Sequence, residues 1–111
     1  MIFVIQINLR YNRDDKISGY RVSGHSGTEI RGKDIVCAGV SSLAQSALLG
    51  IGKHLHRDID FHIDPSGDLR LSLKDEPDDL TEAILQTMRL GLIEIERISP
   101  GAVSIRESRD E

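Results

Sequence analysis

A histidine and the only cysteine of the chain, His25 and Cys37, stand twelve positions apart with a glycine-bearing segment between them. An imidazole can take the proton of a thiol, and the thiolate that results is the nucleophilic form of cysteine. The protonated imidazole can later deliver that proton to a leaving amine. Since glycines allow tight turns, the segment between the two can fold back. The pair therefore predicts a site for nucleophilic attack on a carbonyl group, provided that the fold brings the two side chains together.

The residues before Cys37 predict that it lies in the first turn of a helix. Asp34 is a favourable N-cap residue directly before an apolar pattern of helical spacing. With that cap, Cys37 is the third helical residue, near unpaired backbone N–H groups and the positive end of the helix dipole. Such a position with a cationic neighbour can lower a cysteine pKa from about 8.5 to roughly 3.5–7.5. The same N–H groups can hold the oxyanion of a tetrahedral intermediate.

A second interpretation makes both residues ordinary parts of the fold. Cysteine is among the most buried residue types, and Cys37 falls on the apolar stripe of its helix, where packing is the commoner role. A histidine after a strand is commonly a polar surface residue. A core cysteine does not require a long irregular loop, however, and residues 24–33 form one. This loop favours the catalytic interpretation and leaves the packing interpretation open.

Alternating apolar and polar residues predict five strands around this segment. They cover residues 2–10, 17–23, 58–64, 69–73 and 102–106. Short turn sequences join the first strand to the second and the third to the fourth, so each pair is expected to form a hairpin. In the third strand one face is apolar: Ile59, Phe61 and Ile63.

Two segments show helical spacing instead. The first begins at about residue 35, ends at Gly50 and Gly52, and has one apolar face: Cys37, Val40, Ala44, Ala47, Leu48 and Ile51. The second begins at Asp79, the expected N-cap, with Glu82 completing a capping box. Its expected inner stripe is Leu80, Ile84, Met88, Gly91 or Leu92, Ile95 and Ile98.

The predicted order is β-β-α-β-β-α-β. With two hairpins in this order, we expect an α+β fold in which two helices pack on one face of a mainly antiparallel sheet. No linker or repeat divides the chain, so residues 1–111 are expected to form a single domain. The charged tail at about residues 107–111 is expected to be frayed.

The composition is that of a water-soluble globular protein, with 39% hydrophobic and 29% charged residues and a net charge of −4. That charge argues against a direct nucleic-acid partner, which usually requires a basic excess or stripe. One cysteine cannot form an internal disulfide, the start of the chain alternates like a strand rather than a leader, and no apolar run approaches the length of a membrane span. We expect a cytoplasmic protein with no membrane contact.

A local group of histidines and aspartates invites a metal interpretation, namely His54, His56, Asp58, Asp60 and His62. Their spacing matches no strong zinc motif, and alternation places Asp60 and His62 on the outer face of a strand. The glycine-bearing loop also lacks the spacing of a phosphate-binding loop or a dinucleotide-binding motif. We expect no metal and no cofactor.

The residues around the histidine and the cysteine resemble a known pattern. The chain has Gly24-His25 near the end of the second strand, then Gly32-Lys33-Asp34, and residues 36–43 read Val-Cys-Ala-Gly-Val-Ser-Ser-Leu. This combination is similar to the motif of the ribosomal-processing cysteine protease family, called Prp. The spacing from histidine to cysteine and the order of elements also agree, so the resemblance covers nearly the whole chain.

The resemblance implies a function and a set of site residues. Family members are small cytoplasmic bacterial proteases, typically homodimers, that remove a short N-terminal extension from a protein of the large ribosomal subunit. The nucleophile would be Cys37, and the general base and acid would be His25. Asp34 would help to hold the loop, and Ser41, one turn beyond the cysteine, would support the site. Gly24 and Ala38 belong to the same motif as supporting positions.

Two other functions remain open from the residues alone. The same loop can serve as a docking surface in a non-catalytic ribosome-assembly or protein-binding module. A thiol-based redox or acyl-transfer site is a third interpretation, although the chain offers no second cysteine to resolve an oxidised sulfur.

Overall fold

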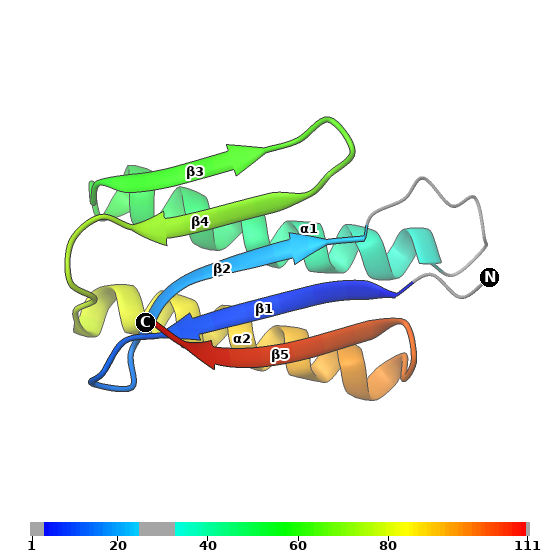
Figure 1. Cartoon of the computed structure of the whole chain (residues 1–111). Helices are drawn as coiled ribbons and strands as arrows, with labels where there is room; N and C mark the ends of the chain where they lie inside the picture. Colours follow the sequence, from blue (N-terminus) through cyan, green and yellow to red (C-terminus); the bar gives the residue numbers. More distant parts are fainter. Residues whose placement is uncertain (1–3, 25–32, 111) are drawn as a thin grey trace.

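The computed structural model describes residues 4–24 and 33–110, with the backbone alone at residues 33 and 34. Within these described residues eight elements follow one another: β1 Ile5–Tyr11, β2 Ile17–Ser23, α1 Lys33–Leu49, η1 Gly50–His54, β3 Ile59–Ile63, β4 Leu69–Leu73, α2 Asp79–Ile98 and β5 Val103–Arg109. The predicted order of strands and helices is confirmed. Figure 1 shows the strands forming one layer and both helices lying behind it.

The five strands form one sheet in the order β3-β4-β2-β1-β5. Three of the four neighbouring pairs are antiparallel, and only β1 and β5 run parallel. Both expected hairpins are present, β1 with β2 and β3 with β4. The prediction of two helices on one face of a mainly antiparallel sheet is therefore confirmed (Figure 1).

Strand β1 shows why the sheet has one buried face. Ile5, Ile7 and Leu9 are almost completely buried, whereas Gln6 and Asn8 between them are exposed. Because successive side chains of a strand point to opposite faces, the first set packs under the helices and the second faces solvent. The apolar residues of β2, β4 and both helices complete this core.

A buried tyrosine joins α1 to the sheet. Tyr20 of β2 is only 2% exposed, and its hydroxyl donates a hydrogen bond of 2.7 Å to the backbone carbonyl oxygen of Ala44. Burial raises the pKa of Tyr20, because the phenolate would lose its hydration there. The phenol therefore stays protonated and fixes the middle of α1 over β2.

The expected apolar face of the first helix is correct. Val40, Ala44, Ala47, Leu48 and Ile51 are buried, and Cys37 is partly buried against them. The α-helix ends at Leu49, directly before the expected Gly50, but the chain continues without a break in a five-residue π-helix, η1, to His54. Both glycines lie close to apolar side chains, so they permit helical packing here instead of ending the helix.

The second helix begins one residue earlier than predicted. Asp78, not Asp79, is the N-cap, and its carboxylate accepts hydrogen bonds from the backbone N–H groups of Leu80 and Thr81. Thr81, not Glu82, completes the capping box through its hydroxyl. Glu82 instead accepts a hydrogen bond of 2.9 Å from the backbone N–H of Ile17, at the start of β2.

The buried stripe of α2 also differs from the prediction. Its buried residues are Thr81, Leu85, Met88 and Leu92. Leu80 and Ile98, expected on the inner stripe, are 56% and 69% exposed, while Ile84 and Ile95 are only partly buried. The difference lies in the first turns of the helix, where Thr81 and Leu85 are buried in place of Leu80 and Ile84, whereas Met88 and Leu92 are buried as predicted.

The last strand is longer than predicted, and the segment expected to fray is held in place. Strand β5 runs to Arg109 beside β1. Glu107 forms an ion pair of 2.8 Å with Arg89 of α2, and Asp110 forms one of 2.8 Å with Arg10 of β1. The charged residues of this segment were expected to be solvated, but Glu107 and Asp110 instead form ion pairs with arginines of α2 and β1.

One edge of the sheet lies partly beyond the helix layer. The apolar residues of β3 share a face, as predicted, but Phe61 and Ile63 are 50% and 43% exposed. Their neighbours on β4, Leu71 and Leu69, are buried. The helices therefore cover the sheet as far as β4 and the start of β3, where Ile59 packs against the core, and the rest of β3 extends past this cover.

The first helix also revises an expectation about membranes. By length and composition the segment Ile35–His54 could cross a membrane, with a mean hydropathy of 1.6. The expectation that no apolar run approaches this length is wrong by that measure. The core helix of a water-soluble protein passes the same test, and this segment packs its buried face on the sheet.

Candidate active site

Cys37 lies near the start of α1, at the end of the molecule where β2 finishes (Figure 1). The helix begins at Lys33, so Asp34 is its second residue and not its N-cap, and Cys37 is the fifth residue rather than the third. The thiol is partly buried and packs against the hydrophobic core. Cys37 thus combines a core contact with partial access to solvent, and both interpretations of the sequence describe part of its environment.

The neighbouring residues of α1 hold the cysteine in place. Val36 and Val40 are buried on the sheet side, with Val40 completely inaccessible. The helix also lies close to the end of α2, because a Cβ atom added at Gly39 would stand 3.2 Å from Cδ1 of Ile95. A larger residue at this position would therefore press against α2.

Three supporting positions of the predicted site fall on this helix. Ala38 is exposed, directly after the cysteine, whereas Ser41 is half-buried. Ser41 stands four residues beyond Cys37, so both lie on one side of the helix about one turn apart. Asp34 lies on the same helix one turn before Ala38, and only its backbone is described.

Gly24 provides the exit from β2 toward the predicted histidine. Its φ of +93° lies in the left-handed region, which favours glycine. A Cβ atom at this position would also stand 2.6 Å from the backbone carbonyl oxygen of Val4. The chain can turn away from the sheet here only because residue 24 has no side chain. The backbone conformation and the contact with Val4 therefore explain why a glycine stands at position 24, and neither could be predicted from the sequence.

The predicted general base, His25, lies outside the described residues, as do residues 26–32 of the loop. The described residues on either side of them are Gly24, after β2, and the start of α1. Because β2 ends at the same side of the molecule where α1 begins, both ends of the loop lie on the side that carries the cysteine (Figure 1). The pairing of His25 with Cys37 stays a prediction.

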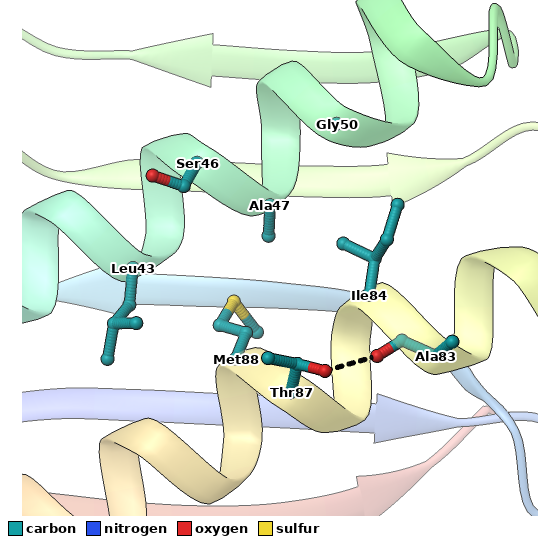
Figure 2. A pocket seen from close by; sticks show the side chains of 8 residues that line it. All are labelled: Leu43, Ser46, Ala47, Gly50, Ala83, Ile84, Thr87 and Met88. Carbon is teal, nitrogen blue, oxygen red and sulfur yellow. Dashed lines mark hydrogen bonds between the residues drawn. The ribbon is translucent and has the colours of Figure 1, made fainter.

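An apolar groove between the two helices was not predicted. It has a volume of about 360 Å³ and is lined by Leu43, Ser46, Ala47, Gly50, Ala83, Ile84, Thr87 and Met88. Figure 2 shows these side chains converging from α1, η1 and α2, with the Thr87 hydroxyl donating to the Ala83 carbonyl oxygen at 2.7 Å. The groove begins six residues beyond Cys37 and runs away from it. The small residues on the facing sides of the helices, such as Ala47, Gly50 and Ala83, are the sequence feature from which this groove could have been predicted.

The histidine and aspartate group of the sequence does not form a metal site in the described structure. Within residues 4–24 and 33–110, no three or more histidine, cysteine, aspartate or glutamate side chains lie close enough to hold a metal ion together.

Comparison with protein families gives a match over most of the chain. The family described as "Cysteine protease Prp" matches residues 4–104. No curated protein sequence matches the chain.

Solved structures show the same fold. A ribosomal processing protease Prp from Staphylococcus aureus, in complex with a substrate peptide, has a TM-score of 0.85 at 25% identity, over 94% of this chain and 99% of that one. The same protease with a covalently linked product peptide has a TM-score of 0.83 at 26% identity and the same coverage. SMU.848 from Streptococcus mutans has a TM-score of 0.85 at 20% identity, over 96% of each chain, and this likeness concerns the fold alone.

Proposed function

Because the chain belongs to the Prp family of cysteine proteases, we propose that it is an endopeptidase that removes a short N-terminal extension from a protein of the large ribosomal subunit. The observation that supports this most directly is the partly exposed thiol near the start of α1, on the side where the loop bearing His25 leaves β2. The similar protease from Staphylococcus aureus is described as a ribosomal processing protease and binds a substrate peptide.

The proposed reaction has two steps. The thiolate of Cys37 attacks the carbonyl carbon of the scissile peptide bond, after His25 has taken the thiol proton. The C–N bond then breaks, the imidazolium of His25 protonates the leaving amine, and a thioester joins the substrate's acyl group to the sulfur. Water, deprotonated by His25, attacks the thioester, and the sulfur leaves as a thiolate. His25 then gives the proton taken from water to the Cys37 sulfur, so the thiol and the neutral imidazole are restored after one turnover.

The supporting residues have distinct proposed roles. Gly24 directs the chain out of β2, so it positions His25 without contacting substrate. The unpaired backbone N–H groups of the first turn of α1, at residues 33–36, come just before Cys37 and are suited to hold an oxyanion, while Ala38 follows the cysteine as an exposed residue. Ser41 supports the cysteine from the next turn, and Asp34 helps to hold the loop.

The test is cleavage of a recombinant precursor of the large-subunit protein that carries an N-terminal extension. Wild-type protein should release the extension, and Cys37→Ala and Cys37→Ser should lose cleavage while keeping an unchanged circular dichroism spectrum. His25→Ala should lose cleavage as well. Trimming by Cys37→Ala at the wild-type rate would refute the mechanism.

The same experiment separates the alternative function. In a non-catalytic ribosome-assembly or protein-binding module, the wild-type protein would bind the precursor without shortening it, and Cys37→Ala would bind equally well. Mass spectrometry of the precursor after incubation distinguishes this outcome from cleavage.

We propose further that the protein is a cytoplasmic homodimer, as the family resemblance implies. The apolar groove between α1 and α2 faces outward from the helix layer (Figure 2), and we propose that a second copy of the chain covers it. Ala83→Glu would place a charge in the groove and should shift sedimentation from dimer to monomer. Leu90→Glu is the matched control, since Leu90 is also exposed on α2 but does not line the groove. A wild-type protein that sediments as a monomer at all concentrations would contradict the proposal.

A further inference from the structure

The open face of the sheet, opposite the helices, carries a row of three arginines, one histidine and one asparagine that crosses all five strands. Strand pairing places Arg106 of β5 beside Asn8 of β1, Asn8 beside Arg21 of β2, Arg21 beside Arg70 of β4, and Arg70 beside His62 of β3. All five residues are exposed. We call this set the arginine row.

These side chains point away from the core because of strand alternation. Asn8 and the three arginines each have a sequence neighbour that is buried or packs against the core, as Ile7, Val22, Leu69, Leu71 and Ile105 show. Neighbouring residues of a strand face opposite sides of the sheet, so the arginine row faces solvent in front of the sheet in Figure 1.

The arginines of the row lack the ion pairs that most other described arginines have, namely Arg10, Arg57, Arg89, Arg97 and Arg109. Among the described residues, Arg21, Arg70 and Arg106 form no ion pair with a carboxylate. Arg10 gives the contrast on the same face, because it donates to Asp110 and to the Ser72 hydroxyl, both at 2.8 Å. The row therefore has three guanidinium groups whose charge is not neutralised by a contacting carboxylate.

Two hollows lie along the row and share one lining residue, Arg21. The larger, of about 490 Å³, is lined by Gln6, Ile7, Asn8, Arg21, Ser23, Ser104 and Arg106. The smaller, of about 180 Å³, is lined by Arg21, His62, Asp64, Asp68, Leu69 and Arg70. Amide and hydroxyl groups surround the arginines in the first hollow, and two carboxylates limit the positive charge at the far end of the second.

This chemistry fits phosphate groups better than a peptide. A guanidinium group binds phosphate with two parallel hydrogen bonds, and amide and hydroxyl groups donate further ones. Strands lie about 4.7–4.9 Å apart, so a row across five strands extends about 19 Å and can meet several phosphates of one nucleic-acid strand. An acidic peptide would gain most of its affinity from apolar anchors in pockets, and the row is lined mainly by polar side chains.

We propose that the arginine row binds the phosphodiester backbone of single-stranded RNA without sequence preference. The row contains no phenylalanine, tyrosine or tryptophan on which bases could stack, so the contact is to the backbone. The net charge of −4 had argued against a nucleic-acid partner. The net charge of the whole chain does not reveal a local basic row, because the pairing of the strands brings together residues that are far apart in sequence. The proposal stands independently of the protease function.

The test is fluorescence anisotropy of a labelled mixed-sequence RNA of about 20 nucleotides, titrated with the full-length protein at several salt concentrations. The variant Arg21→Gln/Arg70→Gln/Arg106→Gln should bind at least about tenfold more weakly than wild type at low salt. The slope of log affinity against log salt should also fall by about 2, since each phosphate contact to a single strand contributes roughly 0.7. Each single substitution should reduce the slope by about 0.7.

The matched control removes three positive charges elsewhere, with Arg13→Gln/Lys53→Gln/Arg97→Gln. These residues lie in the β1–β2 turn, in η1 and in α2, so RNA affinity should stay within about twofold of wild type. Equal weakening by both triple variants would show that only net charge matters and would overturn the proposal. It would also be overturned by a wild-type protein that does not bind RNA at low salt, or that binds poly-glutamate more tightly than RNA.

Discussion

The two helices cover the same face of the sheet but begin in different ways. At the start of α2, the Asp78 carboxylate accepts two backbone hydrogen bonds and also pairs with Arg57 at 2.9 Å. At the start of α1 lies the partly exposed thiol of Cys37. A helix start can thus be used for stability or for chemistry, and the difference follows from the side chains that surround it.

Beyond their first turns, the helices differ in the same way, because α2 has more polar contacts than α1. From Ile35 to Leu49, α1 has no charged residue, and its small side chains allow close approach to the sheet and to α2. By contrast, α2 carries ion pairs to β5 and within its own last turns, Arg89 with Glu107 and Arg97 with Glu94. Packing fixes α1, whereas packing and polar contacts together fix α2.

The largest expected effect concerns the thiol at the start of α1. If this helix start activates Cys37, the thiol should react with iodoacetamide at pH 6 at least about tenfold faster than a cysteine of ordinary pKa, because a pKa one unit lower gives tenfold more thiolate. His25→Ala should slow the reaction. The measurement is the pseudo-first-order rate by mass spectrometry from pH 5 to 9. If wild type and His25→Ala both react at the rate of an ordinary thiol across this pH range, the start of α1 does not activate Cys37.

The next effect concerns the turn that leads toward α1. Gly24→Ala should lower the free energy of unfolding by about 1–3 kcal/mol, because the residue has a positive φ and its Cβ would contact the Val4 carbonyl oxygen. Urea denaturation measures this change. Gly101→Ala is the matched control: its φ of +87° is similar, but nothing lies within 4 Å of the added Cβ. A loss at Gly24 no larger than at Gly101 would rule out the Val4 contact as a cause.

A smaller effect is expected at the start of α2. Asp78→Ala should lower the free energy of unfolding by about 0.5–2 kcal/mol, since it removes the N-cap. Asp79→Ala should change it by less than about 0.5 kcal/mol, because the Asp79 side chain is fully exposed. Thiol reactivity should be unchanged in both variants. Equal losses at the two positions would contradict the assignment of Asp78 as the cap.

The smallest expected effect is the pH dependence of that cap. Hydrogen bonds from Thr81 and Arg57 lower the pKa of Asp78 in the folded protein, against the opposing effect of desolvation. The folded state therefore binds fewer protons than the unfolded state, whose aspartate pKa is about 3.9. The stabilisation is present above that value and is lost as pH falls through the lower, folded pKa. The difference in stability between wild type and Asp78→Ala should shrink accordingly between pH 5 and pH 2.

Sequence patterns predicted the elements well where burial on one face dictates the residue types. The alternation in β1 and the spacing around Val40 are direct results of that burial. The choice between Asp78 and Asp79 could not be predicted in this way, because both are good cap residues and Arg57 comes from a distant segment. The exposure of Phe61 was equally hidden, since it depends on how far the helix layer extends over the sheet.

The candidate site was predictable as a set of residues and less so as an arrangement. The position of Cys37 near a helix start followed from helical spacing, but the helix begins before Asp34 and not after it. The arginine row was not predictable at all, because it depends on the register of five strands. Three of its arginines lie on separate strands, more than 30 residues apart in sequence.

The parallel pairing of β5 with β1 sets an order of events during synthesis. The hairpin of β1 and β2 can form early, yet one edge of β1 lacks its neighbour until residues 103–109 have been translated. A nascent chain that ends before β5 would expose the backbone donors and acceptors of an apolar central strand, which is a template for pairing with another chain. The sheet is thus complete only after β5 has been translated, and chains stalled before it would be prone to aggregate.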